Sequence, residues 1–325
     1  MPGDTPPLPV AGQPSPVPPV PDDGAMGGDA VHQGPAALLS EVESAVTGFL
    51  EAARAGEPLP LDALEGLASR LVDALAAGDD LVLKAMDGDG GEGSLAAHCA
   101  HVAIFAVRIA AGMDLPRSER VRAALAGLVH DVGMVRLPPD LAQVDRKLRV
   151  REREALERHP EEGFTILSAL GPAYQWLAEV AQQEHEREDG SGYPRGLVRD
   201  EIGEIARIVA LADIYQSLTH PRPHQPTLVP FDAVREMLTS QRGRFSERAM
   251  KGLMQGLSAF PVGSLVRLNT REVARVVAAN PASPLRPVVE VLLDAAGDRV
   301  EGRRIDLAKS GLQYIVDSVT VHEMV

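Results

Sequence analysis

The stretch ERVRAALAGLVHDVG (119–133) carries an apolar helical stripe directly into a histidine and an aspartate. Leu125 and Leu128 share one face of the predicted helix, because residues three or four apart lie together on a helix surface. His130 and Asp131 follow at the end of that face. An imidazole and a carboxylate placed side by side at the end of a buried stripe can bind neighbouring metal ions.

The same helical spacing turns further polar residues toward the core. A single inward histidine is more often a hydrogen-bonded core residue than a metal ligand. A whole set is different, because an unpaired buried carboxylate costs on the order of several kcal/mol and a shared cation removes that cost. Facing helices can build such a site, and its N and O donors favour iron, manganese, cobalt or zinc. The other inward residues on apolar faces are His98, His159, Glu184 and Asp213.

The net charge of −14 is unevenly distributed along the 325 residues. Residues 1–95 hold three basic and sixteen acidic residues, so the remainder of the chain carries a net charge of only −1. We find no basic stripe for a nucleic-acid polymer, but a small phosphate ester could bind if a metal supplied positive charge. The single cysteine, Cys99, excludes an internal disulfide framework and is expected to be a small core residue.

The chain shows no signal peptide and no membrane segment by composition. It begins MPGDTPPLPV, which lacks the basic and apolar regions of a secretory signal. No run approaches the roughly twenty apolar residues that a membrane span needs. We therefore expect a cytoplasmic protein.

The N-terminal part divides into a tail and two helices. Residues 1–35 are rich in Pro, Gly and Asp, which predicts a disordered tail. Residues 36–90 are expected to form a helical hairpin, with helices over 37–54 and 61–77. The Gly-rich run 86–93 is interpreted as a hinge. We expect this whole part to be dispensable for the folding of the remainder but to alter its association or activity.

The rest of the chain is mainly helical and ends in β structure. Residues 91–255 are predicted to form a helical bundle that contains the metal site. Residues 256–325 are expected to be a small β-rich appendage, with β-branched segments at 264–269, 271–277 and 286–293. The fold class is therefore mainly α, with an N-terminal helical segment and a small C-terminal β appendage.

The order of these motifs resembles the HD-GYP family of HD-domain phosphohydrolases. His98 matches the family's leading histidine, His130-Asp131 its HD pair, and His159 with Gly163 its H…G motif. The resemblance covers about residues 90–320.

The match is sharpest in the loop EHEREDGSGYPRGL (184–197), which resembles the family's HHE…DGxGYP loop. His185 corresponds to the second of its paired histidines, and Gly192-Tyr193-Pro194 supplies the GYP. The segment ARIVALADIY (206–215) resembles the family's RI…AD segment, which ends in an aspartate ligand, here Asp213.

The resemblance implies an HD-type helical fold. It also implies that the protein hydrolyses cyclic di-GMP to linear pGpG or GMP. Two metal ions that share a carboxylate and a hydroxide can clamp a phosphodiester and stabilise its leaving oxygen. We expect two divalent transition-metal ions, Fe or Mn, with His130 and Asp131 as the catalytic pair. Asp131 is expected to bridge the ions. The other ligands are expected to be His98, His130 and Asp213 for one ion, and His159, Glu184 and His185 for the other.

Several positions depart from the family's pattern. Met134 replaces a lysine that supports the substrate phosphate, and Glu184 replaces the first of the paired histidines. Ser94 replaces a glutamate used where a third metal is bound, so we expect two ions and not three. Gln216-Ser217 replaces Asp-Ala, which predicts altered substrate contacts.

Three residues are candidates for substrate binding. Arg222, in an RPH sequence where the family has RPY, and Arg207 are candidate phosphate contacts, with Arg222 ranked higher. Tyr193 could stack on a base or contact a partner, but its Gly-flanked Tyr-Pro could equally be structural loop chemistry.

Three functional hypotheses remain from the sequence. The first is a cyclic di-GMP phosphodiesterase, with a cyclic dinucleotide as its small-molecule partner and N-terminal helices that supply regulation or association, including a homodimer. The second is a catalytically weak or inactive module that binds metal or nucleotide and signals to a protein partner through the GYP loop. The third is an HD hydrolase acting on another phosphate ester.

Overall fold

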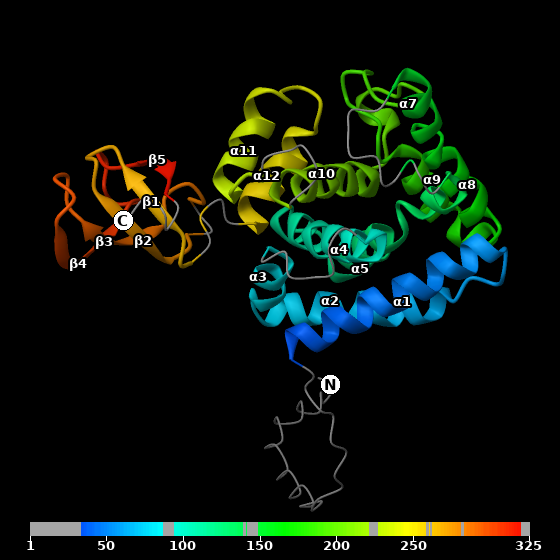
Figure 1. Cartoon of the computed structure of the whole chain (residues 1–325), viewed down its shortest axis with the longest axis horizontal. Coiled ribbons are helices and arrows are strands. Elements are labelled where there is room, and N and C mark those ends of the chain that lie inside the picture. Colours follow the sequence, from blue (N-terminus) through cyan, green and yellow to red (C-terminus); the bar gives the residue numbers. More distant parts are fainter. Residues whose placement is uncertain are drawn as a thin grey trace, which may run out of the picture. The chain divides into compact units, whose positions relative to one another are not determined.

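The structure is a computed structural model that describes residues 34–86, 94–138, 141, 149–220, 227–257, 260, 262–280 and 283–319. The predicted tail up to residue 33 and most of the predicted hinge lie outside the described residues. A body of helices is followed by a small antiparallel sheet (Figure 1). The mainly α fold class expected from the sequence is confirmed.

The helical body is built from the following elements. The α-helices are α1 (Pro35–Ala55), α2 (Leu61–Ala77), α3 (Asp80–Met86), α4 (Leu95–Gly112), α5 (Arg117–Val129), α7 (Val150–Leu156), α8 (His159–Ser168), α9 (Gln175–Gln183), α10 (Glu204–Thr219), α11 (Pro230–Thr239) and α12 (Glu247–Gly256). Short 3-10 helices are η1 (Val132–Arg136), η2 (Pro172–Tyr174) and η3 (Arg199–Glu201).

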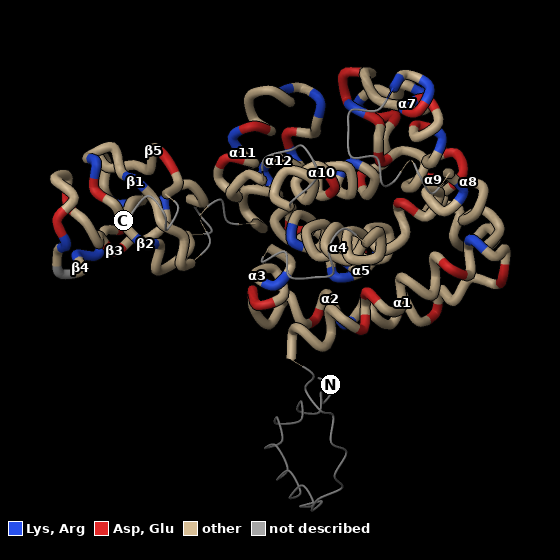
Figure 2. Tube along the Cα trace, in the orientation of Figure 1, with Lys and Arg blue, Asp and Glu red and all other residues tan. Residues whose placement is uncertain are grey.

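Helix α4 is the central helix of this body. Ser94 caps its N-terminus, since Ser94 Oγ accepts a hydrogen bond from Ala97 N at 3.1 Å. Arg108 is its only charged residue, and Figure 2 shows how scarce charge is along α4. Among the described residues it is also the one helix long and apolar enough to span a membrane, yet 72% of it is buried inside the protein. A helix that is apolar on all sides and buried is typical of a protein core.

Helices α1 and α2 belong to the same hydrophobic core as α4 and α5. Figure 1 shows them along one side of α4 and α5, with α10 on the other side. Phe49 and Leu64 are fully buried and join one continuous cluster with Phe105 and Leu128. This shared core argues against our expectation that the N-terminal part is dispensable for folding, because its removal would expose the apolar faces of α4 and α5.

The turn after α5 packs directly on α8. A Cβ atom added to Gly133 would lie 1.9 Å from His159 O and 2.6 Å from Gly163 N, so only a glycine fits there. This close approach packs the turn that follows the HD pair against the H…G motif and brings His159 next to Asp131.

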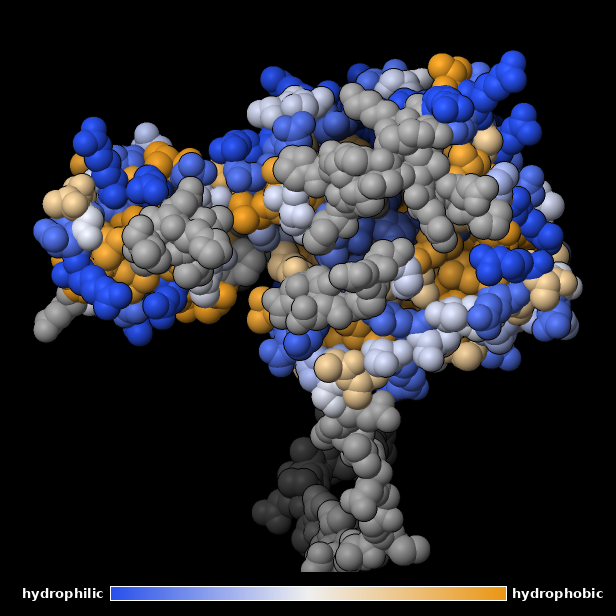
Figure 3. All heavy atoms as spheres, viewed as in Figure 1, coloured by the Kyte–Doolittle hydropathy of each residue, from blue (hydrophilic) through white to orange (hydrophobic). Residues whose placement is uncertain are grey.

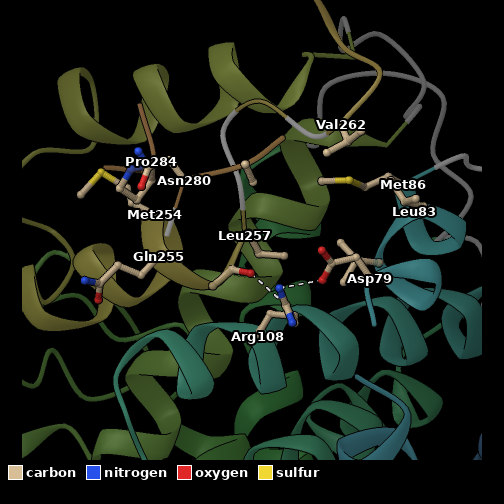
Figure 4. A pocket seen from close by; sticks show the side chains of 13 residues that line it. Asp79, Leu83, Met86, Arg108, Met254, Gln255, Leu257, Val262, Asn280 and Pro284 are labelled. Atoms are coloured by element: carbon tan, nitrogen blue, oxygen red, sulfur yellow. Dashed lines mark hydrogen bonds and ion pairs between the residues drawn. The ribbon is translucent and has the colours of Figure 1, made fainter. Parts of the chain in front are cut away.

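Arg108 ties α4 to two neighbouring helices. Its Nε donates to Gly256 O at 2.8 Å, and its Nη2 lies 2.8 Å from Asp79 Oδ1 (Figure 4). The partly buried guanidinium thereby links α4 to the end of α12 and to the residue that precedes α3.

The C-terminal sheet has the strand order β4-β3-β2-β1-β5, and all neighbours are antiparallel. Its core contains Val266, Val276, Val289 and Val291. Three of the strands correspond to the β-branched segments predicted from the sequence. The strands are β1 (Leu265–Leu268), β2 (Val273–Ala278), β3 (Val288–Leu293), β4 (Arg299–Asp306) and β5 (Ile315–Ser318).

The outer surface is mixed in character. On the face seen in Figure 3, hydrophilic side chains predominate, and apolar side chains reach the surface in separate areas between them. Charged residues of both signs lie on the outer helices and on the sheet (Figure 2).

Candidate metal centre

Seven side chains from five segments of the helical body converge on one region. Two of these segments carry two neighbouring residues each. His130 and Asp131 lie at the junction of α5 with η1, and Glu184 and His185 lie in the turn after α9. Three of the seven are almost completely buried, with exposures of 1–2% for His130, His159 and Glu184. The seven are His98 on α4, His130 and Asp131 between α5 and η1, His159 at the start of α8, Glu184 and His185 after α9, and Asp213 on α10.

These side chains form two groups in which each residue offers one ligand atom. The ligand atoms within each group all lie within 4.8 Å of one another, a spacing that one metal ion can span. The first group is Asp131, His159, Glu184 and His185, and the second is His98, His130 and Asp213. The sequence analysis divided the same residues in this way, with Asp131 between the groups.

Two histidines are oriented by the helical turns that precede them. His130 Nδ1 lies 2.9 Å from Gly127 O, and His159 Nδ1 lies 2.7 Å from Leu156 O. A carbonyl only accepts, so each ring must donate its Nδ1–H. Each Nε2 therefore points toward the centre, as in histidines whose second nitrogen ligates a metal.

Asp131 lies between the two groups. Its Oδ1 is 3.3 Å from His159 Nε2, whereas its Oδ2 is 3.5 Å from His98 Nε2 and 3.6 Å from His130 Nε2. One carboxylate oxygen thus faces each group. This arrangement fits a carboxylate that bridges two ions.

Glu184 has the least satisfied environment of the centre. Its carboxylate is completely buried, and neither oxygen makes a hydrogen bond. Oε1 lies 3.4 Å from His159 Nε2 and Oε2 lies 3.6 Å from His130 Nε2, which itself has no hydrogen-bond partner. Buried polar atoms are nearly always bonded, so three unbonded atoms that face one another fit a site that binds a cation.

The protein's own charges shift the pKa values of the centre in both directions. Burial opposes protonation of His130, but Glu184 and Asp131 outweigh burial and raise its pKa well above the usual value. Burial raises the pKa of Glu184 despite the nearby His130. Burial and, next to it, the neighbouring His159 lower the pKa of His185 to about 3. His185 is therefore neutral at pH 7, the form in which imidazole binds metals.

The GYP loop supports His185. The Tyr193 ring stacks on the His185 ring, with centroids 4.8 Å apart and an angle of 25° between the planes. Close packing explains the glycine of the loop, because a Cβ atom on Gly192 would lie 2.4 Å from Arg187 N. The buried Glu186 holds the far side of the loop by accepting hydrogen bonds from two backbone N–H groups, of Arg195 at 2.7 Å and Leu197 at 2.9 Å.

Arg187 is a buried cation that the sequence analysis did not single out. Its Nη1 donates to Glu184 O at 3.0 Å and Glu186 O at 2.8 Å, and its guanidinium lies over the Phe245 ring. Arg187 therefore fixes the backbone that carries Glu184. The only sequence signal for this role was its position in EHER (184–187), directly after the predicted ligands. An arginine next to a loop is usually solvated.

Arg207 and Ser94 make contacts outside the group of seven ligands. Arg207 forms ion pairs with Glu188 at 3.4 Å and with Asp200 at 3.5 Å, so it fastens the loop after α9. Ser94 caps α4. Arg222 lies outside the described residues.

The comparisons with known proteins agree with this fold and centre. Residues 86–247 match the family model described as HD domain, and residues 265–325 match the model described as KOW domain associated with HD domain. The chain belongs to the HD-domain family. The resemblance to the HD-GYP family is thereby confirmed at the level of the HD domain.

Curated relatives of the HD region are phosphodiesterases. The chain is 30% identical over 215 residues to a cyclic di-GMP phosphodiesterase of Pseudomonas aeruginosa, which covers 66% of this chain and 52% of the relative. It is 35% identical over 170 residues to the cyclic di-GMP phosphodiesterase response regulator RpfG of Xanthomonas campestris, covering 52% of this chain and 44% of the relative. The chain thus spans about half the length of these relatives.

A solved structure shares the fold. It is an HDG"Y"P protein from Bdellovibrio bacteriovorus, with a TM-score of 0.58 and 15% sequence identity, covering 70% of this chain and 73% of that chain. At this identity the likeness concerns the fold alone.

Proposed function

We propose that this protein is a metal-dependent phosphodiesterase that hydrolyses cyclic di-GMP to linear pGpG or GMP. The observation that carries the proposal is the buried Glu184 carboxylate, whose two unbonded oxygens face the Nε2 atoms of His130 and His159. A protein that folds around such a group needs a cation to offset its burial.

The donor set fits two divalent transition-metal ions, with iron or manganese preferred. His98, His130 and Asp213 would hold one ion, His159, Glu184 and His185 the other, and Asp131 would bridge them. Imidazole and carboxylate donors suit iron and manganese, whereas soft thiolate donors select other metals. When bound, two such ions supply a nucleophile at neutral pH and neutralise the charge of a phosphodiester.

The chain's own residues position these groups. Asp131 presents one oxygen to each side, and His130 is held by Gly127 O so that its Nε2 faces the same space. Tyr193 and Arg187 hold the segment that carries His185 and Glu184. Groups that are already in position stabilise charge most strongly in a buried site, because no reorganisation is needed when the charge develops.

The substrate class comes from the relatives. Two of them are named cyclic di-GMP phosphodiesterases, and the region that resembles them contains every proposed ligand. Met134, in place of the phosphate-supporting lysine, leaves recognition of the phosphate to the ions and to residues such as Arg222. A cytoplasmic location follows from the substrate proposed here.

The test is hydrolysis by the protein reconstituted with Mn²⁺ or Fe²⁺ under reducing conditions. We expect conversion of cyclic di-GMP to pGpG or GMP, measured by chromatography beside 3′3′-cGAMP and cyclic di-AMP. Binding of cyclic di-GMP without cleavage, at full metal loading, would favour the second hypothesis, a module that signals through the GYP loop. If only another cyclic dinucleotide were cleaved, the proposed substrate would be wrong, but the proposed metal-dependent phosphodiester hydrolysis would stand.

A further inference from the structure

Gln216 lies on α10, three residues after Asp213, and is 6% exposed. Its Oε1 is 2.9 Å from His98 Nδ1. On the other side of the ring, His98 Nε2 lies 3.5 Å from Asp131 Oδ2 and 3.4 Å from Asp213 Oδ1. The His98 ring is therefore held between an amide oxygen at one nitrogen and two carboxylates at the other.

The tautomer of His98 depends on the group that meets its Nδ1. An amide oxygen accepts, so it requires Nδ1–H and leaves a lone pair on Nε2. Without an acceptor at Nδ1, the carboxylates of Asp131 and Asp213 would favour the opposite tautomer, in which Nε2 carries the proton. That tautomer cannot bind a metal through Nε2.

We propose that Gln216 is a positioning residue that holds His98 in its Nδ1–H tautomer and so presents the Nε2 lone pair to an ion shared with His130 and Asp213. The inference rests on the proposed function for the role of that ion. It replaces our expectation that the Gln216-Ser217 change alters substrate contacts, because the Gln216 side chain is buried against a candidate ligand.

The backbone of Gln216 is also fixed. Its carbonyl oxygen accepts a hydrogen bond from His220 N at 3.1 Å, and His220 Nε2 lies 2.5 Å from Ala85 O on α3. The end of α10 is thus tied to α3. Because its backbone is restrained, the Gln216 side chain can hold the His98 ring in one orientation.

The neutral amide has a consequence for the ion. Carboxylate acceptors increase the basicity of a ligating histidine, and loss of such a second partner typically lowers metal affinity about 10–100-fold. An amide orients the ring but adds no charge. The His98 group also offers three ligand atoms against four in the other group, so an ion on the His98 side should be the more weakly bound of the two.

The test compares Gln216→Met, which removes the acceptor at similar size, with Gln216→Glu, which keeps an acceptor and adds charge. Thr239→Val on α11 is the control, because the exposed Thr239 hydroxyl donates to Arg235 O within its own helix. The readouts are the ¹⁵N shifts of His98 in protein stripped of metal, and equilibrium binding of Mn²⁺.

We expect Gln216→Met to shift His98 toward the Nε2–H tautomer and to weaken the weaker Mn²⁺ site about 10–100-fold. Gln216→Glu should retain Nδ1–H and bind Mn²⁺ at least as tightly as the native protein, and Thr239→Val should change neither readout. A folded Gln216→Met protein with unchanged tautomer and affinity overturns the inference.

Two outcomes separate this inference from the proposed function. If the native protein binds no Mn²⁺, the proposed function fails, while the tautomer in the stripped protein still decides the role of Gln216. If Gln216→Met does not fold, Gln216→Glu decides: loss of the Nδ1–H tautomer in that folded variant overturns the inference.

Discussion

His159 Nε2 and His185 Nε2 lie 2.9 Å apart, although the two residues belong to α8 and to the turn after α9. Burial opposes protonation of His159, but Glu184 and Asp131 raise its pKa, whereas His185 is neutral. A protonated ring donates from both nitrogens, so His159 donates its Nδ1–H to Leu156 O and also supplies the proton between the two Nε2 atoms. An ion bound to both nitrogens would take the place of that proton. The relationship is maintained by Tyr193, whose ring stacks on His185.

Tyr193 should therefore act on metal binding through its ring. We expect Tyr193→Ala to weaken metal binding about tenfold, within the range found for residues that support a ligand. Tyr193→Phe, the matched control, should keep native affinity because the stacked ring remains. Isothermal titration with Mn²⁺ measures both. A Tyr193→Ala protein with native metal affinity but a raised KM would show instead that Tyr193 stacks on the substrate.

Glu184 should be indispensable for full metal loading. We expect Glu184→Ala to lose at least one ion per chain and to reduce hydrolysis at least about 100-fold, because a ligand contributes no less than the residues around it. Glu179→Ala on the exposed side of α9 is the control and should leave both unchanged. Metal analysis by mass spectrometry is the measurement. Two ions per chain and unchanged turnover in Glu184→Ala would show that Glu184 is no ligand.

Metal binding should release protons near neutral pH. The raised pKa of His130 means that the folded, metal-stripped protein holds a proton there above pH 6.5, and that the stability this proton adds is lost as pH rises through the raised value. Glu184 shares the tendency, whereas His185, with a pKa of about 3, has no proton to release. We therefore expect metal affinity to rise with pH between about 6 and 8. Titrations in buffers of different ionisation enthalpy count the protons; a pH-independent affinity would contradict the assignment of His130.

The N-terminal helices should be required for the stability of the HD region. Phe49 is fully buried in the core shared with α4, so Phe49→Ala should lower the free energy of unfolding by about 3–5 kcal/mol. Leu83, which is 40% exposed, provides the control Leu83→Ala with a small effect. Urea unfolding followed by circular dichroism should show a single transition. A stable, cooperatively folding fragment that begins near residue 91 would contradict the shared core.

Much of this architecture could be predicted from local sequence patterns. The apolar period gave the helix over 61–77 with the bounds of α2, and β-branched runs located three of the five strands. The inward direction of His98, His159 and Asp213 followed from helical spacing. Local patterns of this kind need no knowledge of which helices touch.

The rest depends on contacts between distant parts of the chain. Nothing in the sequence shows that α1 and α2 complete the core around α4, because an amphipathic hairpin could equally dimerise. The contact between His98 Nδ1 and Gln216 Oε1 joins residues 118 positions apart, and no local pattern predicts it. Arg207 was a candidate phosphate contact from its sequence motif, and the fold places Glu188 3.4 Å from it.

The most direct test of the account is the metal content of the reconstituted native protein, measured beside a His130→Ala/Asp131→Ala double variant and paired with cyclic di-GMP turnover. We predict two ions per native chain with hydrolysis, and fewer than one ion with no detectable hydrolysis in the double variant. Fewer than one ion per native chain, or equal loading of both proteins, would contradict the proposed two-metal centre.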